Sequence, residues 1–334
     1  MNMINETAGI TPVSVYQWED ILSMQAPTPK LHKPYTLGMW ACIVVFLVSI
    51  STIFATVYDN YQNHLADVAR VEAITVLDNE YCGESLLGKV LPHDETRGLT
   101  QKLLDQYFSG ITYEELTKED IIYPGNPTMS YDTIYRYQNT TIGKYQYVSK
   151  GMNFSTRRTG DGPIGFVVYS TEDSLNDYNT ACRQIYDILA ELNINGSVTK
   201  KEAIIRINEW ICDNRYYEMD PYKREWSTLH SVQGDSGVCY NYTVLFQMLC
   251  LGAGIECEYI VSDNGAHCWN KVYSNDGSYW FVDVCWNDGS VTGITGDPID
   301  ENKTLAFDWF GSGRYDYLLE TEAEFHASHA EYFQ

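Results

Sequence analysis

Three side chains in the second half of the sequence have the types and order of a nucleophilic centre: Cys239, His267 and Asp283. Cys239 ends the glycine-containing stretch QGDSGVC and begins a run typical of an amphipathic helix. The unpaired N–H groups and the dipole at the start of a helix favour an anion. Because the thiolate is the reactive form of cysteine, this position predicts a nucleophile. The alternative is a cysteine that only fills space in the core.

His267 and Asp283 lie on two strands of a predicted meander. Its strands, separated by DNG and NDG turns, are predicted at 256–262, 267–273 and 279–286. Side chains alternate between faces, so residues 267 and 283, which share parity, are expected on one face, against the helix that begins at Cys239. A buried Asp283 among aromatic residues needs a cationic partner, which His267 can supply. The three residues then act as nucleophile, base and orienting acid.

The remaining cysteines give no sign of a metal site. The sequence has nine cysteines and no C-x-x-C pair, so no metal ligand set and no cofactor is predicted. Cys268 has an even number and Cys285 an odd one, so on neighbouring strands they are predicted to point to opposite faces of the sheet. They then cannot form a disulfide. Cys250 and Cys257 are expected to fill the core. Acidic turns leave a dependence on calcium open, and no EF-hand pattern is present.

The order of the other elements predicts an α+β fold, with helices before an antiparallel sheet. Apolar periodicity predicts helices at 60–77, 95–108, 177–193 and 200–213, and strands at 133–139, 144–150 and 165–170. Residues 58–172 carry no motif that we can interpret and are predicted to be an accessory α+β region. Residues 173–334 are predicted to form the domain that carries the chemistry.

Residues 37–57 contain no charged side chain and are long enough to cross a bilayer as a helix. Lys30 and Lys33 precede this segment, whereas Asp59 and Asp67 follow it. The positive-inside rule therefore predicts a cytoplasmic tail at 1–36, a single-pass anchor and an extracytoplasmic C-terminal part. The formal net charge of −23 argues against nucleic acid as a partner.

The segments GVCYNYT, GAHCWNKV and FVDVCW resemble the signature blocks of the transglutaminase-like superfamily, whose core is a papain-like cysteine hydrolase arrangement. The resemblance covers roughly residues 175–290, and more weakly the tail to 334. It implies that Cys239 is the nucleophile, His267 the general base and acid, and Asp283 the partner of the imidazole.

Two further residues are candidates for stabilising an oxyanion. Gln233 lies six residues before Cys239, a spacing similar to that of the oxyanion-hole glutamine of papain-like proteases. Its amide and the Cys239 N–H could together hold the developing charge, although a surface glutamine in a loop is the alternative. Animal-type transglutaminases use an aromatic residue for this role, which makes Tyr240 or an upstream tryptophan a candidate.

These observations predict a membrane-anchored acyl-transfer enzyme that attacks peptide or side-chain amides through a thioester. Resolution by water would make it a protease or amidase, which we favour because nothing marks an amine-acceptor site. Resolution by an amine would make it a cross-linking transglutaminase. Substrates outside the membrane would be surface proteins or wall peptides. The alternative is a non-catalytic, membrane-tethered binding module with the same fold.

Overall fold

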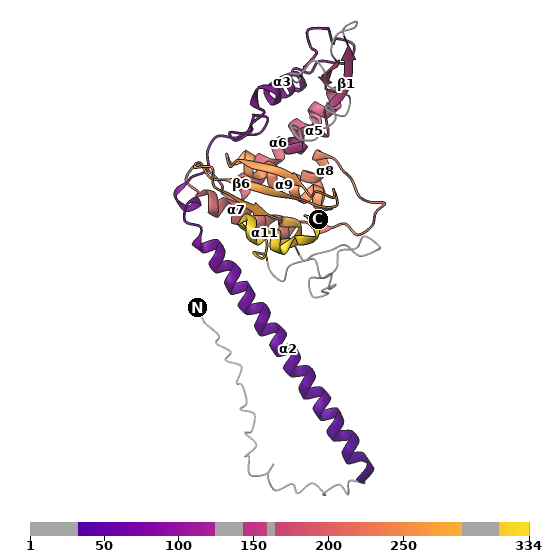
Figure 1. Ribbon diagram of the computed structural model, residues 1–334, viewed down its shortest axis with the longest axis vertical. Helices are drawn as coiled ribbons and strands as arrows, with labels where there is room; N and C mark the ends of the chain where they lie inside the picture. The colour runs from indigo at the N-terminus through magenta and orange to yellow at the C-terminus, as the bar shows by residue number, and fades with distance from the viewer. Residues whose placement is uncertain (1–32, 124–142, 159–163, 289–313, 334) are drawn as a thin grey trace, which may run out of the picture. The chain divides into compact units, whose positions relative to one another are not determined.

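The computed structural model describes residues 33–123, 143–158, 164–288 and 314–333 (Figure 1). The chain divides into two compact units, Met1–Asp59 and Asn60–Gln334. The predicted strand at 133–139 lies outside the described residues. All the candidate site residues lie in the second unit.

Helix α2 (Lys33–Ala73) is the first described element and contains the predicted span at 37–57. Its segment Cys42–Ala73 reaches a mean hydropathy of 2.0, and its apolar window is not buried in the protein. The hydroxyls of Ser51 and Thr52 donate to backbone carbonyls one turn earlier, at 2.8 and 2.9 Å. These polar groups therefore need no water. By length and composition, α2 could cross a membrane.

The chain between α2 and the catalytic candidates forms short helices and one hairpin. These elements are η1 (Leu77–Asn79), α3 (Arg97–Phe108), η2 (Gly143–Tyr145), α5 (Gln146–Ser149), β1 (Asn153–Arg158) and β2 (Ile164–Tyr169). The predicted helix at 95–108 and the predicted strand at 165–170 are confirmed. β1 pairs with β2 in antiparallel register.

The predicted strand at 144–150 is wrong, because this segment forms η2 and α5. Tyr145 and Tyr147 would share one face of a strand, and both side chains are buried here. Tyr145 donates its hydroxyl proton to Asp94 at 2.7 Å, and Tyr147 accepts from the N–H of Gly88 at 3.1 Å. The two hydroxyls thus form hydrogen bonds to residues 88–94, and the helical conformation of η2 and α5 allows both contacts.

Four helices lie between β2 and the sheet: α6 (Glu172–Glu191), α7 (Lys200–Asn214), α8 (Thr228–Gln233) and α9 (Cys239–Gly252). The helices predicted at 177–193 and 200–213 are confirmed. The hydroxyls of Thr171, Thr199 and Ser227 accept hydrogen bonds from first-turn N–H groups and so fix where α6, α7 and α8 begin.

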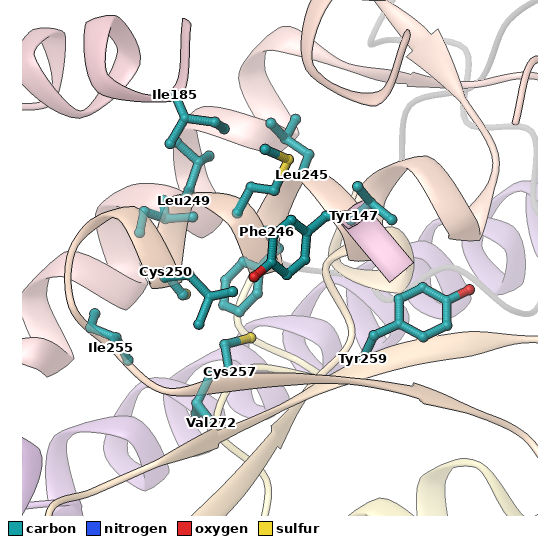
Figure 2. Close-up of a cluster of buried hydrophobic side chains, with 14 of the residues drawn as sticks. Tyr147, Ile185, Leu245, Phe246, Leu249, Cys250, Ile255, Cys257, Tyr259 and Val272 are labelled. Carbon is teal, nitrogen blue, oxygen red and sulfur yellow. The ribbon is translucent and has the colours of Figure 1, made fainter. Parts of the chain in front are cut away.

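Helix α9 is the centre of the core, since every residue from Tyr240 to Gly252 is buried. Figure 2 shows Leu249 beside Ile185 of α6. It also shows Cys250 and Cys257 within the same apolar cluster. Both cysteines are free and buried, which confirms that they fill the core.

The sheet is an antiparallel meander of β5 (Cys257–Val261), β6 (Cys268–Tyr273) and β7 (Tyr279–Val282). In its register Asn270 lies opposite Val282. The predicted NDG turn joins β6 to β7, and its Gly277 has φ 89°, a conformation that favours glycine.

The two faces of the sheet are covered by different helices. On one face, Asn270 donates its side-chain amide to the carbonyl of Thr243 in α9 at 3.1 Å. On the other face, the rings of Trp269 and Phe281 pack on Phe325 of α11 (Glu322–Ser328) at 4.9 and 4.8 Å between centroids. Helix α11 is followed by η3 (Ala330–Tyr332). The C-terminal segment therefore covers the second face of the sheet.

Candidate active site

Cys239 is the first residue of α9, as predicted, and the chain before it is held in place from two sides. The short parallel strands β3 (Tyr216–Tyr217) and β4 (Ser236–Gly237) pair just before the helix. The Asn241 side chain accepts from the N–H of Val238 at 3.0 Å. A Cβ on Gly237 would lie 2.5 Å from Asn241, so only glycine fits this approach. The sulfur is thereby set at the start of the helix.

His267 and Asp283 flank the strands that were predicted to contain them. His267 immediately precedes β6, and β7 ends at Val282. Asp283 is instead the N-cap of α10 (Val284–Asn287), where its Oδ1 accepts from the N–H of Trp286 at 3.1 Å. The prediction of a strand through residue 286 is therefore wrong. An aspartate that caps a helix stops the strand.

The predicted contact between these two residues is present: the Nε2 of His267 lies 2.5 Å from Oδ2 of Asp283. They continue the face of Trp269 and Phe281, which α11 covers. The expectation that this face lies against α9 is thus wrong. From its position just before β6, His267 acts on Cys239 by lowering the pKa of the thiol.

The electrostatics of the site favour a thiolate paired with an imidazolium. The hydrogen bond from the Cys268 thiol lowers the pKa of Cys239 well below the usual value, and His267 lowers it further against the effect of burial. Burial would lower the pKa of His267, but the charge and hydrogen bond of Asp283 raise it to about 10. Burial would likewise raise the pKa of Asp283, yet His267 and His329 hold it far below its usual range.

Cys268 is a site residue that sequence reasoning used only to exclude a disulfide. It lies on the α9 face of the sheet, where its thiol is 3.5 Å from the Thr243 hydroxyl and lowers the pKa of Cys239. The Thr243 hydroxyl lies 2.8 Å from the carbonyl of Cys239 and 3.1 Å from that of Cys268, which ties α9 to β6. Cys285 is a free, buried thiol in α10. The prediction that Cys268 and Cys285 point to opposite faces of the sheet assumed that both lie on strands. It does not apply to Cys285, because β7 ends at Val282.

His329 is a second site residue that the sequence did not reveal. Its Nε2 lies 3.1 Å from Oδ2 of Asp283. It belongs to the HASHAEYF stretch, 46 residues after Asp283, and no periodicity links the two. Only the packing of α11 on the sheet brings them together.

The oxyanion candidates lie in different places. Gln233 is exposed and lines a groove with Trp210 and Arg215; the structure does not bring it to Cys239. Tyr240 is buried next to Cys239, with its ring 5.7 Å from that of Trp226. Helix geometry leaves the first-turn N–H groups without partners inside the helix. The N–H groups of Cys239 and Tyr240 are therefore suitable donors.

The same cluster contains three potential metal ligands. One ligand atom from each of His267, Asp283 and His329 lies within 4.8 Å of the others, and all three residues are buried. A cation there would have to break the hydrogen bonds of 2.5 and 3.1 Å that join both imidazoles to the carboxylate. The carboxylate of Asp283 is therefore better suited to accepting hydrogen bonds from both imidazoles than to binding an ion.

The sequence of this region also identifies its family. Residues 187–284, which contain all three predicted catalytic residues, match the sequence model of the transglutaminase-like superfamily. This segment is a transglutaminase-like domain. Its match ends one residue after Asp283, so the family pattern does not include α11 or His329.

Among the solved structures that match this chain are two of low similarity. One is a candidate cysteine protease from Cytophaga hutchinsonii, at 13% identity and a TM-score of 0.27, covering 41% of this chain and 63% of its own. The other is a TGase, at 9% identity and a TM-score of 0.26, covering 65% of this chain and 63% of its own. The chain thus spans less than two thirds of either structure. No curated protein matches the sequence.

Proposed function

We propose that this chain is a membrane-anchored, extracytoplasmic cysteine enzyme that cleaves peptide or side-chain amides through a thioester. The observation that carries the proposal is the pairing of His267 with Asp283 at 2.5 Å, beside a Cys239 whose pKa the imidazole lowers. Cys239 is half-buried at the start of α9, whereas the other two residues are buried. A thiolate held beside an imidazolium is poised for attack on a carbonyl.

In the first half-reaction the Cys239 sulfur forms a bond to the amide carbonyl carbon. The first-turn N–H groups of α9 hold the oxyanion. His267 then gives its proton to the leaving nitrogen as the C–N bond breaks, and a thioester remains on Cys239. Asp283 keeps the imidazole oriented and stabilises its charged form throughout.

In the second half-reaction His267 accepts a proton from the incoming nucleophile. Water gives a free carboxylate and regenerates the thiol, whereas an amine gives a new amide. We favour hydrolysis, because nothing in the sequence marks an amine-acceptor site. A protein cross-linking transglutaminase is the alternative within the same chemistry.

The pH range of this chemistry follows from the two shifted pKa values. Attack needs the Cys239 thiolate, which persists down to its lowered pKa. Protonation of the leaving amine needs the His267 imidazolium, which is lost above about pH 10. The proposed enzyme is therefore active across the neutral range and fails at both extremes.

The membrane placement rests on α2 and on the charges around it. Residues 37–57 would form the anchor, with the tail at 1–36 in the cytoplasm and the catalytic domain outside. Substrates there would be surface proteins or wall peptides. Protease digestion of intact cells tests the topology: the domain is expected to be degraded from outside, and protection would contradict it.

A simple acyl donor tests the enzyme proposal. A p-nitrophenyl ester is expected to release one equivalent of p-nitrophenol in a burst and to leave an acyl mass on the Cys239 peptide. The Cys239→Ala variant should give neither. Added methylamine would yield an amide product only from a transamidating enzyme. Absence of the burst in the wild-type protein would favour a non-catalytic binding module.

A further inference from the structure

His329 is fully buried behind the thiol site, on the face of the sheet that α11 covers. Its ring is stacked between Phe325, at 3.9 Å and 17°, and Trp286, at 4.2 Å and 16°. Such a position would suit an apolar ring. A buried imidazole needs hydrogen-bond partners on both nitrogens, and those partners decide its role.

One partner is the carboxylate of Asp283. Its Oδ2 faces both the Nε2 of His267, at 2.5 Å, and the Nε2 of His329, at 3.1 Å. Its Oδ1 accepts from the N–H of Trp286. Asp283 is thus a carboxylate with three donors, and two of these are imidazoles that share the oxygen Oδ2. His329 takes up part of the negative charge that His267 would otherwise face alone.

The second partner extends this line away from the thiol. Nδ1 of His329 lies 2.8 Å from the hydroxyl of Ser328, which lies 3.2 Å from the carboxylate of Glu320. Glu320 is itself buried. A chain of polar groups therefore runs from Asp283 through His329 and the half-buried Ser328 to Glu320, and it orients the His329 ring. The Ser328 hydroxyl also lies 3.1 Å from the carbonyl of Phe325.

We propose that His329 is a positioning residue of the thiol site, donating from Nε2 to Asp283 so that the charge of this carboxylate is partly compensated and stays directed at His267. This inference rests on the proposed function. His329 lies outside residues 187–284, the segment that matches the family.

The physical consequence concerns both reacting groups. A less compensated negative charge on Asp283 disfavours the Cys239 thiolate and favours the His267 imidazolium. Removing the donor at 329 should therefore move the whole pH dependence of thiol reactivity upward. A side chain that only fills space would leave that dependence where it is.

Two substitutions separate these roles. His329→Phe keeps a ring for the stacks on Phe325 and Trp286 but removes the donor, whereas His329→Gln keeps an N–H donor but loses the ring. Alkylation of Cys239 by iodoacetamide would be followed by mass spectrometry across pH. We expect His329→Phe to shift the profile upward by about one unit, a tenfold slower reaction on the acid limb. His329→Gln should stay within about twofold of the wild type.

The opposite ranking, in which His329→Phe behaves as wild type and His329→Gln does not, would overturn the proposal in favour of packing. If both variants fail to fold, Ser328→Ala tests the proposal, because it removes only the hydroxyl that is hydrogen-bonded to Nδ1 of His329. An upward shift of its profile supports the proposal and an unchanged one contradicts it. A wild-type Cys239 that reacts like an ordinary thiol would instead refute the proposed function itself.

Discussion

The thiol site is built from two sides of one sheet, and the two sides differ in how they are encoded. On the α9 side, Cys239, Thr243 and Cys268 act through a helix start and one strand. On the α11 side, His267 and Asp283 lie within the family match, but their network includes His329, which lies beyond it. The α9 side determines where the nucleophile is. The α11 side determines how the groups that activate it are charged.

The largest expected effect comes from removing the imidazole that joins the two sides. His267→Gln takes away the positive charge beside Cys239, so the pKa of the thiol should rise toward its ordinary value. We expect alkylation of Cys239 at pH 6 to slow by about a hundredfold or more. His326→Gln, an exposed histidine of α11, is the control and should have no effect. Equal alkylation rates in the His267→Gln and His326→Gln variants would show that the His267 imidazole does not control the reactivity of Cys239.

A matched pair of core truncations compares the two sides directly. Phe325→Ala removes the ring on which His329, Trp269 and Phe281 pack. Leu249→Ala truncates the α9 core. Both residues are fully buried, and each variant should lose about 3 kcal/mol of unfolding free energy in urea titrations.

Only Phe325→Ala should also alter the pH profile of Cys239 alkylation, since it loosens the network around Asp283. If Leu249→Ala altered the profile equally, the distinction between the two sides would fail.

Cys268 tests the α9 side by itself. Cys268→Ala removes the hydrogen bond that most strongly lowers the pKa of Cys239. Its acid limb of alkylation should move up, with a rate about tenfold lower at pH 5 to 6. Cys268→Ser, which keeps a donor, should restore most of the rate. An alanine variant with the wild-type profile would show that the imidazole alone sets the reactivity.

The smallest expected effect is on stability. Burial raises the pKa of Glu320 to about 7. A carboxyl whose pKa is raised by folding stabilises the protein below its unfolded pKa, and that stability is lost as the pH rises through about 7.

Glu320→Gln should therefore gain about 1 kcal/mol over the wild type at pH 8 and little at pH 5, in chemical denaturation. Exposed Glu331→Gln is the control. An equal gain at both pH values would contradict the shift.

The sequence predicted the parts of this site that local patterns encode. A glycine turn before Cys239 and two Asp-Gly or Asn-Gly turns fixed the helix start and the meander. The third strand was predicted to end at residue 286 instead of Val282, because a capping aspartate looks like a strand residue between Val282 and Val284. The contact of His329 with Asp283 left no trace in the sequence, since it depends on how α11 packs. The strand prediction at 144–150 failed because the hydroxyls of Tyr145 and Tyr147 bond to Asp94 and Gly88, contacts that no local pattern encodes.

The most direct test of the account measures alkylation of Cys239 in the wild-type protein between pH 5 and 9, with the partly buried Cys182 as an internal reference. Burial raises the pKa of Cys182, so its rate should fall steeply as the pH is lowered. We predict that Cys239 reacts at pH 6 within about threefold of its rate at pH 9. A Cys239 rate that falls in parallel with that of Cys182 would contradict the account.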